Sequence, residues 1–366
     1  MSGSSRPVVR IALVGCGTIA RTVHLPTLAR MDGVRVVALV DPSTDARRLA
    51  SAITPGARQA ASLAEALRHE PESEAAEAVV ICTPIPVLAG IAIDVFAAGR
   101  HVYVEKPLAT DAASARSLRA AWQAAQRIGA VGFNYRQHPL IARAREIVQR
   151  GGIGDVVGVH GLFTSRPAIV PDWKQEKKSG GVLFDAASHH VDLVSWLVDD
   201  APTEVSARVA SRRTPDDTAV LLCRFARGAV LQGTYSRDAA TDDHLTIIGT
   251  SGKIIVDRMA GLGVDVTTGP RDRAIMRRLQ RTITTITSSA FARSRVVRPD
   301  AEPSFRVALE RFVHDVREWP HTSHTGPASL PTIDDGLRCL SVLLAARTAA
   351  ESGRWEVVHP LVDTSR

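Results

Sequence analysis

A glycine turn near the start of the chain constrains the fold more than any other feature. The hexapeptide GCGTIA at 15–20 follows an apolar, β-prone run at 8–14 and precedes a helical stretch. A GxGxxA pattern in that setting is typical of a strand–turn–helix unit that binds a dinucleotide. Gly15 permits the tight turn, Gly17 leaves room for a pyrophosphate, and Ala20 keeps the helix close to the strand. We therefore predict a dinucleotide site in this part of the chain.

Two further features bear on dinucleotide binding, and the second indicates which dinucleotide is preferred. Thr18 and Ile19 open the helix, and the free N–H groups and positive dipole end of a helix N-terminus bind phosphates. Asp41 ends the second apolar run, where a carboxylate accepts hydrogen bonds from the adenosine ribose and repels a 2′-phosphate. Arg47 and Arg48 follow closely and could bind such a phosphate, but at the start of a helix we expect them to be solvated. The pattern favours NAD over NADP.

The order of strands and helices changes near residue 150. Before it, strands alternate with helices, which predicts a parallel sheet with helices on both faces. After it, β-rich runs joined by short turns predict a largely antiparallel sheet with one helix packed on it. We predict an α/β protein with a dinucleotide-binding domain at 1–132 and a second domain at 133–366, with the helix 333–351 packing back on the first domain. The predicted strands are 8–14, 34–40, 76–84, 101–107, 130–136, 156–165, 203–211, 218–226, 229–237, 244–252 and 253–258, and the later helices are 184–198, 303–318 and 333–351.

Two groups of residues have the chemistry of a catalytic site. Glu105-Lys106-Pro107 ends a predicted strand, at the carboxyl edge where parallel sheets bind ligands. The ammonium of Lys106 can donate a hydrogen bond to a substrate oxygen there, and Pro107 restricts its backbone and allows a cis bond. Asp185 and His189 are four residues apart, so on a helix they share one face. A histidine suits proton transfer at neutral pH, and a carboxylate can orient it.

Other residues near these groups have both a structural and a functional interpretation. Asn134, Tyr135 and Arg136, at the end of the predicted strand 130–136, are expected to contact substrate or to lie near the domain junction. Trp173 could line a pocket or belong to the core. His190 points about 100° away from its neighbour on a helix and is predicted to be structural. Asp192 could anchor the helix or contact substrate.

Charge is concentrated in one segment. The net charge is +7, and the run from Arg271 to Arg298, with eight arginines and one acid, carries all of it. We expect a solvated insertion, with contact to a phosphate-bearing substrate or a neighbouring subunit as the alternative. No nucleic-acid motif or interleaved aromatic residue accompanies the arginines, which argues against a nucleic acid partner.

Composition narrows the remaining classes of protein and of site. The four cysteines are scattered, so they are expected to be reduced core residues without a disulfide frame or a metal site. No apolar run is long enough to span a membrane. The short, polar N-terminus lacks the apolar stretch of a secretory signal, and we expect a cytoplasmic protein.

Together these motifs resemble the Gfo/Idh/MocA family of dehydrogenases over nearly the whole chain. The resemblance implies an N-terminal Rossmann domain, a C-terminal α/β domain with an open, mostly antiparallel sheet, and a homodimer or homotetramer formed through that sheet. Ala187 stands where the family often has glycine, and the segment 259–302 is longer and more basic than usual. The motifs that carry the resemblance are GCGTIA with the following HLPTL, CTP at 82–84, EKP at 105–107, GFNYR at 132–136 and DWK…SGGVLFDAASHHVDL at 172–193.

The resemblance also implies residue roles. Lys106, Asp185 and His189 match the family's catalytic residues, and the proline of the EKP element is commonly cis. In the oxidative direction His189 takes the hydroxyl proton, Lys106 stabilises the oxyanion, Asp185 orients His189 or a substrate hydroxyl, and the nicotinamide takes the hydride. The predicted cofactor contacts are Gly15, Gly17, Thr18, Ile19, Asp41, Thr83, Pro84, Glu105 and Lys106, and the predicted substrate contacts are Lys106, Asn134, Arg136, Trp173, Asp185 and His189.

The predicted function is hydride transfer between NAD and a ring alcohol or ketone. The substrate class is a sugar, a cyclitol or a sugar derivative, including phosphorylated and nucleotide-linked sugars. Two alternatives stay open. One is an enzyme that keeps NAD bound and uses it transiently, as related glycosidases and aldose–aldose oxidoreductases do. The other is a non-enzymatic sugar sensor, although a sensor has no need of the proton-transfer group at His189.

Overall fold

The computed structural model describes residues 8–68, 74–167, 179–268, 291, 302–320 and 330–362. The chain divides into two compact units, which we call unit 1 and unit 2. Unit 1 comprises Met1–Asn134 with Phe305–Leu337, and unit 2 comprises Tyr135–Ser304 with Arg338–Arg366. The sequence predicts a single boundary after residue 132, whereas the structure returns a late segment of the chain to the first unit.

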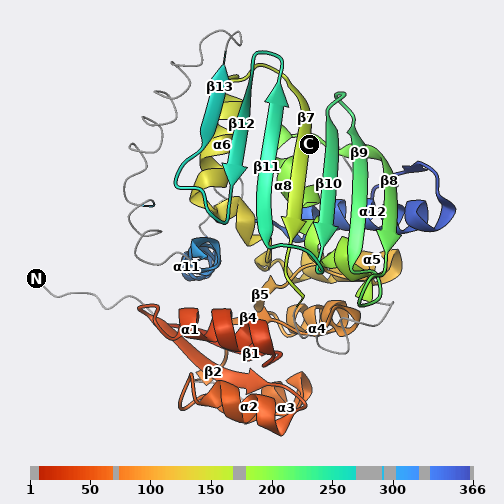
Figure 1. Ribbon diagram of the computed structural model, residues 1–366. Helices are drawn as coiled ribbons and strands as arrows, with labels where there is room; N and C mark the ends of the chain where they lie inside the picture. The colour runs from red at the N-terminus through yellow and green to blue at the C-terminus, as the bar shows by residue number, and fades with distance from the viewer. Residues whose placement is uncertain are drawn as a thin grey trace, which may run out of the picture. The chain divides into compact units, whose positions relative to one another are not determined.

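Unit 1 contains a six-stranded parallel sheet with the strand order β3-β2-β1-β4-β5-β6 (Figure 1). This is the doubly wound order of a Rossmann domain. The apolar strands are mostly buried, as expected for a parallel sheet covered on both faces. The strands are β1 Val9–Val14, β2 Val34–Val40, β3 Arg58–Ala60, β4 Ala78–Ile81, β5 His101–Val104 and β6 Gly129–Val131. The helices are a π-helix at Ala20–His24, α1 Leu25–Leu28, α2 Thr44–Ser51, α3 Leu63–Arg68, α4 Ile85–Ala97 and α5 Ala112–Ala125.

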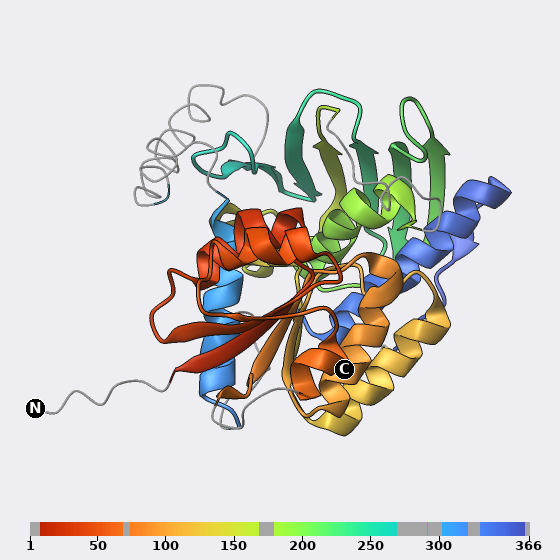
Figure 2. The same ribbon diagram turned by 90° about the horizontal axis from the view of Figure 1, so that it is seen from below.

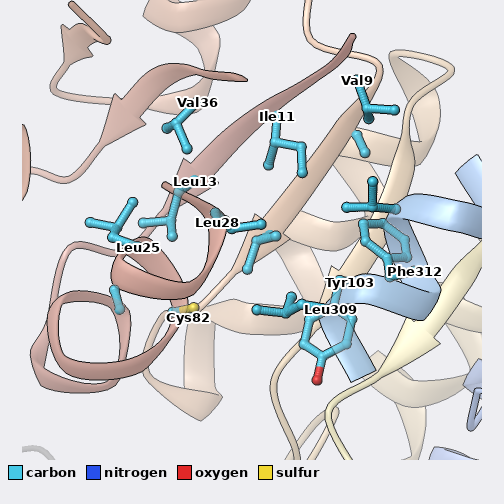
Figure 3. Packing of buried hydrophobic residues seen from close by; sticks show 14 of the residues in the cluster. Val9, Ile11, Leu13, Leu25, Leu28, Val36, Cys82, Tyr103, Leu309 and Phe312 are labelled. Atoms are coloured by element: carbon cyan, nitrogen blue, oxygen red, sulfur yellow. The ribbon is translucent and has the colours of Figure 1, made fainter. Parts of the chain in front are cut away.

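Helix α11, Pro303–Arg317, completes the core of unit 1 although it lies far along the chain. Its Leu309 and Phe312 are fully buried and face Tyr103 of β5 and the apolar side chains of β1 and α1 (Figure 3). Figure 2 shows this helix, in light blue, beside the strands of the sheet. The sequence predicts the apolar face of α11 but not its partner. Burial of that face explains why this segment belongs to unit 1.

Helix α12, Ile333–Ser352, begins in unit 1 and continues in unit 2. Near its start, the side chain of Leu108 lies 2.4 Å from where a Cβ on Gly336 would be, so the helix can approach only with glycine there. Asp334 pairs with Arg119 at 2.7 Å. The start of this helix therefore belongs to the packing of unit 1.

Unit 2 contains an eight-stranded sheet with the order β13-β12-β11-β7-β10-β9-β8-β14. Only the β7–β10 pair is parallel among these strands, so the sheet is mostly antiparallel as predicted. Helices α6 and α8 lie behind the sheet in Figure 1, and no described helix covers the face toward the viewer. The elements are α6 Pro139–Gln149, β7 Val156–Thr164, a π-helix at Leu183–Ala187, α8 Ser188–Val198, β8 Pro202–Ala210, β9 Thr218–Phe225, β10 Val230–Ser236, β11 Asp242–Gly249, β12 Gly252–Asp257, β13 Asp265–Thr268 and β14 Glu356–Val357.

The predicted strand at 130–136 is wrong in its second half. Strand β6 ends at Val131, and Asn134–Gln137 forms a 3₁₀-helix. Pro139 then starts α6, and the Nδ1 atom of His138 accepts a hydrogen bond from the backbone N–H of Leu140. Proline favours the first turn of a helix, so the chain must turn before it rather than continue as a strand. The elements predicted from the sequence do not include α6, β3 or β13.

The structure also shows the state of the four cysteines and the character of the helices. Cys16, Cys82, Cys223 and Cys339 are all buried free thiols, as predicted for core cysteines. In the described ranges, no helix combines the length and apolar character needed to cross a membrane.

Candidate active site

The glycine turn connects β1 to the first helix of unit 1. Gly15 has φ +92°, and a Cβ there would lie 2.7 Å from the carbonyl carbon and oxygen of Cys82, so only glycine fits. A Cβ on Gly17 would meet no described atom within 4 Å. The helix that follows begins at Thr18. Open space in front of a helix N-terminus suits a pyrophosphate, so these residues fit a dinucleotide.

Asp41 joins the glycine turn to the start of α2. Its Oδ2 accepts a hydrogen bond from the N–H of Cys16, and its Oδ1 accepts one from Ser43, each at 2.8 Å. Each carboxylate oxygen has a second lone pair for a ribose hydroxyl. Arg47 donates to the backbone oxygen of Asp41 and to the hydroxyl of Thr44. Arg47 is therefore bound to its own helix start, which weakens the case for a 2′-phosphate there.

Thr83 and Pro84 follow β4 at the carboxyl edge of the sheet. The backbone N of Thr83 lies 2.9 Å from where a Cβ on Gly15 would be, so the structure places Thr83 beside the glycine turn. Its Oγ1 is buried and has no hydrogen-bond partner among the described residues. A buried hydroxyl is costly without a partner. This orphan oxygen, next to the open glycine turn, fits contact with a cofactor.

The EKP element follows β5, and its Lys106–Pro107 peptide bond is cis, as the resemblance implies. The Oε1 atom of Glu105 lies 2.7 Å from Nε2 of the fully buried His24. Burial lowers the pKa of His24, but Cys82 and Glu105 outweigh this effect and raise it to about 10. Glu105, predicted as a cofactor contact, thus has an internal partner. His24 lies in the HLPTL segment, but the sequence did not reveal its role.

Asp185 and His189 lie on the π-helix and α8 of unit 2. The Gly180-Gly181 turn precedes them, and both glycines have positive φ, at +78° and +59°. The carboxylate of Asp185 lies 3.5 Å from the guanidinium of Arg237 and is one-third exposed. Within the described residues, π-helices occur here and directly after the glycine turn of unit 1. Such segments are frequent at functional sites.

His189 is 8% exposed, and its ring stacks on that of Tyr135. The ring centroids are 4.2 Å apart and the planes are inclined by 13°. The neighbouring His190 is fully buried, with its Nε2 3.4 Å from Asp243, which agrees with its predicted structural role. The sequence singled out both His189 and the run Asn134-Tyr135-Arg136 of the GFNYR motif, but it did not indicate that Tyr135 stacks on His189.

Arg136 and Asp192 form a buried ion pair in unit 2. The Nε of Arg136 donates to Oδ2 of Asp192 at 2.8 Å, and its second nitrogen donates to Oδ1. Asp192 therefore anchors α8 to the 3₁₀-helix, which is one of the two roles predicted for it. Substrate contact by Arg136, or by the buried Asn134, stays a prediction. Trp173 and most of the segment 259–302 lie outside the described residues.

A Rossmann domain with an open glycine turn, followed by a domain with a mixed sheet and an Asp/His pair on its helices, is typical of NAD-binding oxidoreductases. Residues 9–133 match the oxidoreductase family with an NAD-binding Rossmann fold, and residues 141–255 match the GFO/IDH/MocA C-terminal domain. The chain belongs to the Gfo/Idh/MocA family.

Named relatives agree with this assignment. An inositol 2-dehydrogenase of Acidothermus cellulolyticus is 30% identical over 273 residues, covering 69% of this chain and 76% of that protein. An inositol 2-dehydrogenase of Rhizobium meliloti is 28% identical over 274 residues, covering 71% and 79%. The crystal structure of GenD2 from gentamicin A biosynthesis, in complex with NAD, is 26% identical with a TM-score of 0.75, covering 98% of this chain and 99% of that one.

Proposed function

We propose that the chain is an NAD-dependent dehydrogenase or reductase that acts on a ring alcohol or ketone of a sugar, cyclitol or sugar derivative. The observation that carries the proposal is a group of suitable residues in each unit. Unit 1 has an open glycine turn beside the orphan Thr83 hydroxyl, and unit 2 has Asp185 close in sequence to a stacked His189. The two inositol 2-dehydrogenases support a cyclitol or sugar as the substrate class.

In this proposal NAD, when bound, supplies the hydride acceptor. Gly17 and the helix start bind the pyrophosphate, and Asp41 binds the adenosine ribose. His189 takes the hydroxyl proton of the substrate as general base. Lys106 donates a hydrogen bond to the substrate oxygen as negative charge develops on it. Asp185 keeps its carboxylate beside Arg237 and orients His189 or a substrate hydroxyl.

The test is a panel of cyclitols, sugars, sugar phosphates and nucleotide sugars, each assayed with NAD and with NADP. We expect oxidation of at least one compound, with one NADH released per product molecule. Product formation without release of NADH would instead show a bound NAD used transiently. Binding of a sugar with no chemical change would contradict the proposal and favour a sensor.

The proposal includes NAD as the preferred cofactor because of Asp41. Removing the charge with Asp41→Asn should raise the ratio of kcat/KM with NADP to kcat/KM with NAD by about tenfold or more, since the repulsion of a 2′-phosphate is lost. Asp45→Asn is the matched control, because Asp45 lies four residues further on, in α2, and pairs with Arg48. A native preference for NADP would contradict this assignment.

We also propose that the chain forms a homodimer or homotetramer through the open face of the unit 2 sheet. The strand register places Val220, Val230 and Val357 on one face, and they are 40%, 40% and 55% exposed. Sedimentation velocity should show a multiple of the chain mass, which Val220→Glu with Val230→Glu should reduce. A native chain that sediments with the mass of one chain would contradict the proposal.

A further inference from the structure

Three side chains of unit 2 form a stack that ends on His189. The guanidinium carbon of Arg258 lies 3.7 Å from the ring centroid of Tyr135. On its other side, the Tyr135 ring stacks on the imidazole of His189 at 4.2 Å. The three residues come from three elements, because Tyr135 lies in the 3₁₀-helix, His189 on α8 and Arg258 directly after β12. One face of the imidazole is therefore covered by an aromatic ring.

A buried ionic network holds the far end of this stack. Arg258 donates to Oδ2 of Asp243 through two nitrogens, at 2.9 and 2.6 Å, and also pairs with Glu302. Burial raises the pKa of Asp243, but His190 and Arg258 outweigh that effect and lower it, so this carboxylate stays ionised. These hydrogen bonds hold Arg258 in place and set the plane of its guanidinium group.

The hydroxyl of Tyr135 belongs to this network and not to proton transfer. It accepts a hydrogen bond from Arg258 at 2.8 Å, and burial raises the pKa of Tyr135, so the phenol keeps its proton. The ring contributes the contact with His189. Rotation of an imidazole about its last torsion is broad and soft, so a stacked ring restricts the direction in which its nitrogens point.

We propose that Tyr135, held in place by Arg258, is a positioning residue for His189 and sets the plane of its imidazole for proton transfer. The catalytic part of this inference rests on the proposed function. The stack itself does not, so it can be tested separately. A displacement of about 1 Å in a reacting group can cost about 100-fold in rate.

The first test is spectroscopic and needs no substrate. Carbon–proton correlation spectra of the native chain should show one histidine Cε1–Hε1 signal shifted by the ring current of Tyr135, identified by its loss in His189→Asn. Tyr135→Leu should return this signal to the position of an unstacked histidine, and Tyr135→Phe should leave it shifted. An unchanged signal in Tyr135→Leu would overturn the inference.

The second test is kinetic, with NAD and myo-inositol, or the panel compound with the highest rate if myo-inositol is not oxidised. Tyr135→Leu should lower kcat by about 10- to 100-fold and move the pH profile of kcat/KM, with the KM for NAD unchanged. Tyr135→Phe should restore most of kcat, because it keeps the ring. Tyr235→Leu is the matched control, since Tyr235 is also a buried ring but packs on His190 instead. If the two leucine variants only lost stability, both would have a lower unfolding temperature and both would keep the native kcat.

A second variant guards against misfolding of Tyr135→Leu. Arg258→Lys keeps the positive charge beside Asp243 but loses the planar fork, so the chain should fold with a smaller shift of both readouts in the same direction. If Tyr135→Leu displaced the His189 signal but kept the native kcat, the positioning role would be overturned while the proposed function stands. If the native chain turned over no panel compound, the proposed function and the catalytic part of this inference would be overturned. A His189 signal shifted by Tyr135 in that same chain would show that the stack forms nonetheless.

Discussion

Lys106→Met should lower kcat for the panel substrate by about 100- to 1,000-fold while the chain stays folded and still binds NADH. The expected loss is that of one donor aimed at an oxygen that gains negative charge in the transition state. Methionine keeps an unbranched apolar side chain of similar length, so the change removes the ammonium group with little change in packing. Steady-state kinetics give kcat, and NADH fluorescence titration reports cofactor binding in the same variant.

The chain provides a control and a coupling test for Lys106. Lys253→Met removes an exposed lysine of β12, and we expect native kinetics. Lys106→Met and His189→Asn should combine with much less than the product of their separate effects, because residues that serve one chemical step are not additive. Native turnover by Lys106→Met, or fully multiplicative effects of the two changes, would contradict a shared catalytic step.

His24→Gln should destabilise the folded chain by on the order of 3–5 kcal/mol at neutral pH. His24 is fully buried and its Nε2 lies 2.7 Å from Glu105, so the change leaves a largely buried carboxylate without its cation. Urea unfolding monitored by circular dichroism measures the difference in free energy. His244→Gln is the control, because His244 forms a similar contact with Asp242 at the surface, where such pairs contribute about 1 kcal/mol or less.

The destabilisation should depend on pH in a defined direction. The pKa of His24 is raised from its ordinary 6.5 to about 10 in the folded chain, so the folded state holds this proton more tightly than the unfolded state. The stability that this proton contributes is fully present below about pH 6.5 and is lost as the pH rises through about 10. The difference between the native chain and His24→Gln should therefore shrink from about pH 7 to about pH 10. A difference that stays constant or grows would show that His24 is not charged in the fold.

Much of unit 1 could be predicted because its signals are local. The sequence places the turn at Gly15 correctly, since only glycine tolerates its positive φ and the approach of the Cys82 backbone. The apolar runs that become β1, β2 and β4 are long enough to be recognised as buried strands. By contrast, β3 has the polar sequence RQA, and it is a strand only because β2 offers it an edge.

The candidate site divides in the same way. Sequence motifs predict roles for Lys106, Asp185 and His189, because the spacing and order of these groups can be read along the chain. The partners of these groups come from elsewhere, as Arg237 follows β10 and Arg258 follows β12. Nothing in the sequence around Arg237 or Arg258 distinguishes these arginines from arginines at the surface.

The sequence by itself determined the class of this protein, from the glycine turn and Asp41 to the EKP element and the Asp/His pair, because each depends on residues that are close along the chain. Only the tertiary structure decided which side chains support them. It placed His24 against Glu105, Tyr135 against His189, and α11 in the core of unit 1. These pairings join segments far apart in sequence, and their energy comes from burial and close packing that exist only once the chain is folded.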